Sequence, residues 1–299
     1  GKAIAFDNIM LIPNVWESQA LFQERFAQIY PLDGTDLILA CRNLALGDCL
    51  VYDRKKEKGI PLLSYGAKFY DFPVVSVFTA KKSHFLVFYG GSIWDRKYLF
   101  LDLVNEEGVK IVDITKLFPE KPADIIWESG KDKVLFAVYK DHINRINVGS
   151  QEFYPRYIEN ITGYGSYGRR LYYLDADKHP MRLLGDVQKD ERLFFGPRPP
   201  YIEDGNHLLT WTKHKIIVNA QPLYEQGLDI EKCFLSKDGH RVIFKDGNMV
   251  NILEIEPQGK NHVDQVVKVK KGTSVAYIQE TGYLYYLSDK DGIFSRIHL

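Results

Sequence analysis

Two pairs of aspartates at predicted turns are the side chains in this sequence that most resemble metal ligands. Asp175 and Asp177 form one Asp-x-Asp pair, and Asp289 and Asp291 form the other. A calcium-binding loop needs further oxygen ligands at fixed offsets and a glutamate that closes the loop. Neither pair is followed by a glutamate at that spacing. We therefore interpret all four residues as solvated turn carboxylates, with a weak cation site as the alternative.

The stretch Gly163–Gly168 matches the Gly-x-Gly-x-x-Gly pattern of nucleotide-binding loops. A dinucleotide site needs a helix after this loop, because the helix N-terminus binds the pyrophosphate. The residues that follow, Arg169–Asp175, read as a strand, so we interpret the motif as a glycine-rich turn packed by aromatic side chains. The eight histidines form no metal-ligand motif, and no serine or cysteine nucleophile signature is present. The sequence thus predicts no catalytic residue, no metal and no cofactor.

The chain has three cysteines, which are too few for a disulfide scaffold. Cys41 and Cys49 flank a predicted hairpin turn at Asn43–Asp48 and could face each other across it. We interpret them as small residues of two strands. A cross-strand disulfide and a metal site are the alternatives, and the metal site lacks the usual Cys-x-x-Cys spacing.

The amino-acid composition is typical of a folded chain with balanced charge. The 299 residues are 45% hydrophobic, which is enough for a sizeable core. Lys plus Arg and Asp plus Glu are both 39, and this balance argues against a dedicated nucleic-acid-binding protein. No apolar run is long enough to span a membrane, so we expect no membrane insertion. The chain begins at Gly1 without a methionine, which indicates a processed or excised piece of a longer protein.

Short strands joined by tight turns are the elements that must position any site. The clearest example is Asp229–Glu256, where three predicted strands are joined by turns containing Asp238-Gly239 and Asp246-Gly247. Asp-Gly pairs between apolar runs are typical of hairpins, because glycine adopts the positive φ that these turns require. A similar four-strand unit recurs about every 41 residues. The apolar second strands of the units are marked by Leu37, Phe85, Val134, Leu171, Leu208, Val242 and Tyr283.

This repeat predicts an all-β fold, a seven-bladed β-propeller formed by a single domain over residues 1–299. The last unit has only three strands, so we expect the N-terminal strand Ala3–Ile12 to complete the last blade. That pairing would close the ring and cover an exposed edge. Six or eight blades are the alternatives, because the fourth and fifth units are short and irregular. We expect a linker at Val15–Phe22, with Trp16 and Phe22 anchoring it to the ring.

One phrase of the sequence resembles a known group of proteins. Phe234–Phe244 reads FLSKDGHRVIF and resembles the turn of TolB-like and WD40-like bacterial propellers, in which Asp-Gly precedes the central strand of a blade. Thr281–Tyr286 resembles a second phrase of the same group. The run Ala5–Ile12, with the segment after it, is also similar to the propeller that follows a PEGA module in some bacterial envelope proteins. The resemblance implies a binding platform without catalytic residues, in an extracytoplasmic, envelope-associated setting.

We therefore predict a non-enzymatic protein-binding or scaffolding role, with a protein partner that the sequence does not identify. The first alternative is a carbohydrate-active or other hydrolytic enzyme that uses the central funnel. Such an enzyme would need paired carboxylates or a histidine cluster there. The second alternative is a regulatory cap of a larger protein. The candidate interaction surface combines a stiff loop with two tryptophans. The alternative for the loop is a plain connection, and the alternative for the tryptophans is packing. The residues are Trp94, Arg192, Arg198, Pro199 and Trp211.

Overall fold

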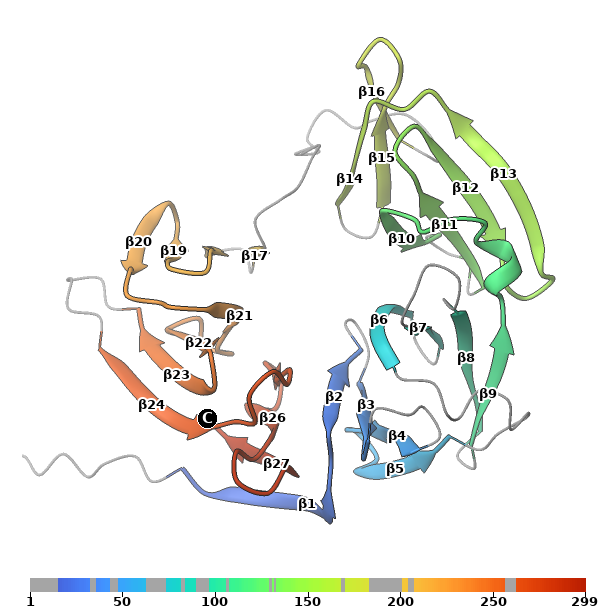
Figure 1. Cartoon of the computed structure of the whole chain (residues 1–299). Coiled ribbons are helices and arrows are strands. Elements are labelled where there is room, and N and C mark those ends of the chain that lie inside the picture. Colours follow the sequence, from blue (N-terminus) through green and yellow to red (C-terminus); the bar gives the residue numbers. More distant parts are fainter. Residues whose placement is uncertain are drawn as a thin grey trace, which may run out of the picture.

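The computed structural model of this chain is built from antiparallel β-strands (Figure 1). It describes residues 16–32, 36–43, 48–62, 74–81, 84–89, 97–105, 108–128, 131, 133–167, 170–182, 201–203, 207–255 and 262–299. One turn of 3-10 helix, η3, spans Thr115–Leu117. The prediction of an all-β chain is confirmed.

The described strands form seven small sheets of three or four strands each. In chain order the strands are β1 (Ser18–Arg25), β2 (Gln28–Pro31), β3 (Leu37–Cys41), β4 (Cys49–Asp53), β5 (Lys58–Pro61), β6 (Val74–Lys81), β7 (His84–Tyr89), β8 (Lys97–Asn105), β9 (Gly108–Asp113), β10 (Asp124–Trp127), β11 (Val134–Val138), β12 (His142–Asn147), β13 (Glu152–Glu159), β14 (Gly163–Tyr167), β15 (Arg170–Leu174), β16 (Pro180–Arg182), β17 (Tyr201–Glu203), β18 (Leu208–Trp211), β19 (Ile216–Val218), β20 (Gln221–Tyr224), β21 (Ile230–Leu235), β22 (Arg241–Asp246), β23 (Met249–Glu254), β24 (Val263–Lys268), β25 (Ala276–Ile278), β26 (Tyr283–Leu287) and β27 (Ile293–His298).

The repeat inferred from the sequence corresponds to these sheets. Each of the seven landmark residues lies in the second strand of a different sheet, from Leu37 in β3 to Tyr283 in β26. These second strands are apolar because they pack against neighbouring sheets, on both faces in the five sheets that have two described neighbours. In β11, for example, all five residues are buried. Periodicity therefore located the sheets correctly, although five of the six spacings between successive landmarks differ from the mean of 41 residues by four to eight residues.

The sheet β21–β24 shows how the local sequence specifies its hairpins. Arg241–Asp246 pairs with both neighbours along its length, and Val242 and Phe244 are fully buried. Gly239 and Gly247 close the two turns with φ of 72° and 61°. A side chain at these positions would be strained, because residues other than glycine rarely adopt positive φ. The predicted hairpins of Asp229–Glu256 are confirmed.

Adjacent sheets are joined face to face by hydrophobic clusters. Six clusters connect the sheets in series, starting at β17–β20 and continuing through β21–β24, the β25–β27 sheet with β1, β2–β5, β6–β9 and β10–β13 to β14–β16. Each cluster takes alternate side chains from strands of two sheets, since successive residues of a strand point to opposite faces. The core is thus a set of layers between sheets.

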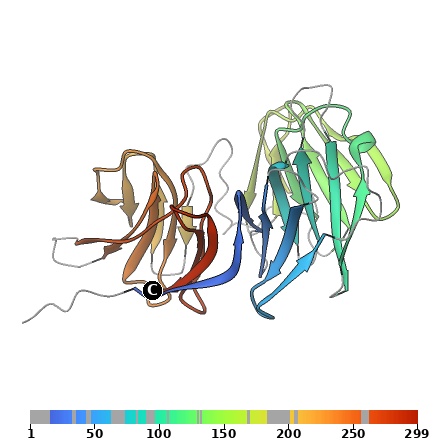
Figure 2. The same cartoon turned by 60° about the horizontal axis from the view of Figure 1, so that its bottom comes forward.

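The predicted closed seven-bladed propeller is wrong for this structure. The structure contains seven separate sheets, none of which is closed or curled, and no hydrophobic cluster of the described residues joins β14–β16 to β17–β20. Figures 1 and 2 show these two sheets standing apart. A closed ring needs a seventh junction between sheets. The repeat length in the sequence predicts the number of sheets, but it does not predict the contact between the two end sheets of the series that would close a ring.

The strand that completes the last sheet also differs from the prediction. Ala3–Ile12 lies outside the described residues, and the strand that pairs with β27 is β1, which begins inside the expected linker and extends three residues beyond it. Figure 2 shows β1 beside β27 and leading into β2. Phe22 stacks on Phe294 with ring centroids 5.9 Å apart, and Trp16 packs against the cluster between β21–β24 and β25–β27. The two aromatic residues therefore anchor this segment as expected.

Cys41 and Cys49 form a disulfide, which corrects the favoured interpretation of two unbonded strand residues. They are directly opposite each other in β3 and β4, with Cα atoms 3.9 Å apart. Whether two strand cysteines meet depends on the register of the hairpin, and the turn alone leaves that register open. Cys233 is the free cysteine, and it is buried between sheets.

Candidate functional site

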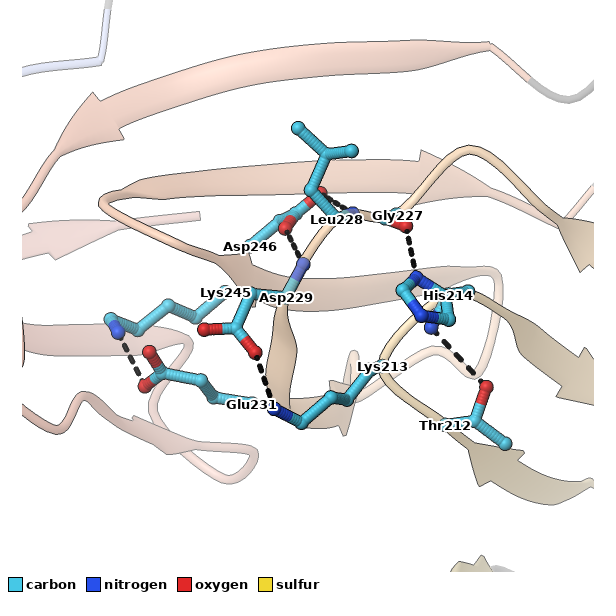
Figure 3. Close-up of polar contacts among 9 residues, drawn as sticks. All are labelled: Thr212, Lys213, His214, Gly227, Leu228, Asp229, Glu231, Lys245 and Asp246. Carbon is cyan, nitrogen blue, oxygen red and sulfur yellow. Dashed lines mark hydrogen bonds and ion pairs between the residues drawn. The ribbon is translucent and has the colours of Figure 1, made fainter.

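The loop between β20 and β21 presents one apolar side chain to solvent. Leu228 is 83% exposed, far more than the other large hydrophobic residues that are exposed among the described part of the chain. Figure 3 shows its side chain pointing away from the polar cluster beneath it. An isolated exposed leucine needs no explanation by itself. The loop that carries Leu228 is unusual because several independent contacts hold it in place.

Asp246 fixes the backbone on both sides of the Leu228 peptide. One carboxylate oxygen accepts a hydrogen bond from the Leu228 N–H at 3.2 Å, and the other accepts one from the Asp229 N–H at 2.7 Å. The Gly247 N–H donates to the carbonyl of Asp229 at 3.1 Å. Asp246 ends β22 in the Asp-Gly turn predicted from the sequence. The same residue therefore shapes its own hairpin and the neighbouring loop.

The residues before Leu228 are held from the opposite side. The Nδ1 of His214 donates to the carbonyl oxygen of Gly227 at 2.9 Å, and the Ile230 N–H donates to the carbonyl of Lys213 at 3.0 Å. A Cβ atom at Gly227 would overlap the side chain of Ile230 and lie 3.1 Å from the Lys213 carbonyl oxygen. A side chain at 227 is disfavoured because Ile230 packs directly against this glycine and would have to move.

Charged side chains surround the base of this loop (Figure 3). Lys213 pairs with Asp229 at 3.4 Å, and the fully buried Lys245 pairs with Glu231 at 2.5 Å. Burial, and then the nearby Asp246 carboxylate, raises the pKa of the Tyr224 hydroxyl above its usual value. We call Gly227, Leu228 and Asp229, with their partners His214 and Asp246, the Leu228 loop. Chemically it is a preformed apolar contact point inside a polar rim.

Two adjoining cavities lie elsewhere, on the sheets β2–β5, β21–β24 and β25–β27. Their volumes are about 530 and 750 Å³, and both are lined by Tyr277, Glu280 and Thr281. The Asp36 carboxylate that lines the larger cavity pairs with Arg54 at 3.5 Å and with Lys55 at 2.7 Å. This carboxylate is therefore neutralised by its neighbours, and the Glu57 carboxylate that lines the same cavity pairs with Arg296.

The residues considered for metal or nucleotide binding have structural roles. The Asp175 carboxylate accepts the His179 N–H at 2.8 Å, and the Asp291 carboxylate accepts the Ile293 N–H at 3.2 Å. Among the described residues, no three His, Cys, Asp or Glu side chains are grouped so that they could hold a metal ion. Gly163–Tyr167 is strand β14, paired with β15, so the glycine motif is largely strand where a turn was expected. His142 is buried and stacks on Tyr139.

Four residues of the predicted interaction surface lie outside the described residues: Trp94, Arg192, Arg198 and Pro199. Trp211 is 8% exposed and packs in the cluster between β17–β20 and β21–β24, so its observed role is packing. The predicted surface as a whole stays a prediction. Leu228 was not among the predicted residues, although an isolated leucine in the polar stretch Gln226–Asp229 was a usable signal.

No protein-family model matches this chain, and no curated protein matches it. Its fold is similar to a solved structure of PorZ, described as an essential bacterial surface component of the type-IX secretion system of Porphyromonas gingivalis. The two chains are 12% identical, with a TM-score of 0.47, and the match covers 95% of this chain and 39% of PorZ. This chain thus spans about two fifths of the length of PorZ. A likeness this distant does not transfer the role of PorZ, and the TolB-like and PEGA resemblances stay hypotheses.

No helix of the described residues is long and apolar enough to cross a membrane.

Proposed function

We propose that this chain is a non-enzymatic scaffold of the bacterial cell envelope that binds a protein partner through the Leu228 loop. The observation that carries the proposal is an 83% exposed leucine on a loop whose backbone is held by Asp246, His214 and close packing at Gly227. Preorganisation lowers the entropy cost of binding, because the contact point needs no ordering when the partner arrives. The occupant that fits is an apolar pocket on a partner protein.

The expected contribution of Leu228 to the binding free energy depends on the apolar surface that it exposes. Complete burial of a leucine side chain contributes about 2 kcal/mol, which corresponds to roughly a 30-fold change in the dissociation constant. The pair of Lys213 and Asp229 beside it is largely exposed, with side chains 75% and 51% accessible. A polar rim around an apolar anchor is the usual anatomy of a protein interface. Leu228 supplies the affinity in this arrangement, and the rim fixes the orientation.

Two observations support the envelope setting. Disulfides form and persist in oxidising compartments, and Cys41–Cys49 is such a bond between two core strands. The Ser236-Lys237-Asp238-Gly239 turn, on which the resemblance to bacterial propellers rests, has the expected local structure. The Ser236 hydroxyl donates to Asp238, and the His240 N–H donates to the same carboxylate at 3.0 Å.

Site-specific photo-crosslinking tests the proposal. A photoreactive phenylalanine replaces Leu228 in the full chain, produced in the cells in which the protein naturally occurs. The matched control carries the same group at Met181, which is 41% exposed on β16 in a different sheet. We expect one protein to crosslink at 228 and not at 181. After identification by mass spectrometry, that protein should bind Leu228→Asp at least 30-fold more weakly than wild type, and Met181→Asp equally well.

The proposal is wrong if position 228 crosslinks no more strongly than position 181, or if the identified protein binds Leu228→Asp and wild type alike. Crosslinking of the chain only to a second copy of itself, with a dimer in light scattering that Leu228→Asp abolishes, would also overturn it. Thermal unfolding of Leu228→Asp should match wild type, since the side chain is exposed and contributes little packing.

A further inference from the structure

Strands β12 and β13 place an arginine beside two tyrosines. Arg145 of β12 lies directly opposite Tyr154 of β13. The central carbon of its guanidinium is 5.6 Å from the centre of the Tyr154 ring and 5.8 Å from that of the Tyr157 ring. The two tyrosines are 41% and 48% exposed, and Tyr157 also packs on the buried Phe136. We call Arg145, Tyr154 and Tyr157 the arginine clamp.

A buried acid fixes the orientation of the guanidinium. Glu128 is 2% exposed, and one of its carboxylate oxygens accepts a hydrogen bond from the Nε of Arg145 at 3.0 Å. The other oxygen pairs with Lys131 at 2.9 Å. The Nε of Arg145 is thereby used, while its two terminal amino groups have no hydrogen-bond partner among the residues that the structure describes. These amino groups form the fork that binds a carboxylate through two parallel hydrogen bonds.

The backbone of β13 is poorly suited to pairing with another strand. Pro155 has no N–H to donate, and Arg156 has a φ of 49° with its N–H bound to the side chain of Asn144 at 2.7 Å. The register shifts between Ile143 and Arg145. Proline and bulges of this kind protect sheet edges from strand addition. A ligand on this face is therefore recognised by side chains.

We propose that the arginine clamp binds an aspartate or glutamate carboxylate of a protein partner. The inference rests on the proposed protein-binding function and adds a second contact site of stated chemistry. The carboxylate pairs with the terminal amino groups of Arg145, and the tyrosine rings cover the sides of the contact. Shielding from water strengthens a charge-assisted hydrogen bond, and arginine and tyrosine are the residues most enriched at the energetic centres of interfaces.

Binding of acidic peptides tests this inference directly. The probe is N-acetylated, C-amidated hexaglutamate, and hexaglutamine is the uncharged control, each titrated into the full chain by calorimetry. We expect hexaglutamate to bind and hexaglutamine not to bind. Arg145→Met should weaken binding at least tenfold, because a charge-assisted bidentate contact is lost. Tyr157→Ala, a change at a half-exposed ring, should weaken it about fivefold without affecting the fold.

Arg156→Met is the matched control, because Arg156 lies on β13 with the two tyrosines, is 53% exposed and pairs with Asp141 outside the clamp. It should bind hexaglutamate within about twofold of wild type. Arg145→Met removes one of the cations that pair with the buried Glu128, so Glu128→Gln/Arg145→Met is measured as well and should show the same loss of affinity.

The inference is overturned if hexaglutamate does not bind, if Arg156→Met weakens binding as much as Arg145→Met does, or if Tyr157→Ala binds like wild type. Tighter binding of an oligogalacturonate than of hexaglutamate, with the same dependence on Arg145, would overturn the assignment to a protein carboxylate. Leu228→Asp should retain full hexaglutamate affinity, so failure of the clamp and failure of the Leu228 loop are distinguishable.

Discussion

Reduction of the Cys41–Cys49 disulfide should lower the free energy of unfolding by an amount that depends on the length of the loop that the bond closes. The bond joins residues with a sequence separation of 8 on adjacent strands. In the chain-entropy model, a loop of this length lowers the entropy of the unfolded chain by about 8 cal/mol/K, equivalent to about 2.5 kcal/mol at 25 °C. We therefore expect reduction to lower the free energy of unfolding by about 2.5 kcal/mol.

Urea unfolding with and without dithiothreitol measures this change. If the dependence of the unfolding free energy on urea is about 3 kcal/mol/M, the midpoint should fall by roughly 0.8 M on reduction. Thiol counting on the denatured chain provides an independent check. One thiol, that of Cys233, should react before reduction, and all three cysteines should react afterwards.

The double variant Cys41→Ala/Cys49→Ala is the control for other effects of the reductant. Its midpoint should be independent of dithiothreitol and should lie near that of the reduced wild type. Three reactive thiols in the unreduced denatured chain would refute the disulfide itself. An unchanged wild-type midpoint, together with full release of the thiols, would refute the entropic argument for its stabilising effect.

Three further predictions concern single residues. Asp246→Ala removes the acceptor for two backbone N–H groups and should lower the free energy of unfolding in urea by about 1–2 kcal/mol. Amide exchange at Leu228 and Asp229 should become faster, and unchanged exchange there would contradict the role of Asp246 in holding the loop. Burial raises the pKa of the Cys233 thiol, so it should react with a disulfide reagent at pH 8 at least 100-fold more slowly in the folded than in the unfolded chain; equal rates would contradict its burial. Burial raises the pKa of Tyr52 to about 12, so the unfolded chain loses this proton at a lower pH than the folded chain. The stability of the fold should therefore be fully present below about pH 10 and should fall as the pH rises toward 12. Tyr52→Phe should reduce that fall without destabilising the protein at pH 7, since no partner for the buried hydroxyl is found in the described structure; an identical alkaline profile for the two proteins would contradict this assignment.

The interaction residues depended on contacts that local sequence patterns do not contain. Leu228 becomes a candidate only because Asp246, in the next hairpin, holds its backbone and His214 holds the preceding carbonyl. Arg145 meets Tyr154 through the register of β12 against β13, and its orientation depends on Glu128, 17 residues away. By contrast Trp211, chosen from the sequence for its size, is buried because an apolar ring in a short strand packs more favourably between sheets.

The sequence by itself determined that the chain forms β-strands and where it turns. Alternation, apolar second strands and the Asp-Gly turns are local properties, and they identified a landmark in each of the seven sheets. Tertiary structure alone decided the rest. It selected β1 as the partner of β27, placed Cys41 opposite Cys49, and left β14–β16 and β17–β20 without a described junction. These outcomes depend on strand register and on packing between distant sheets, and neither is a property of any short stretch of sequence.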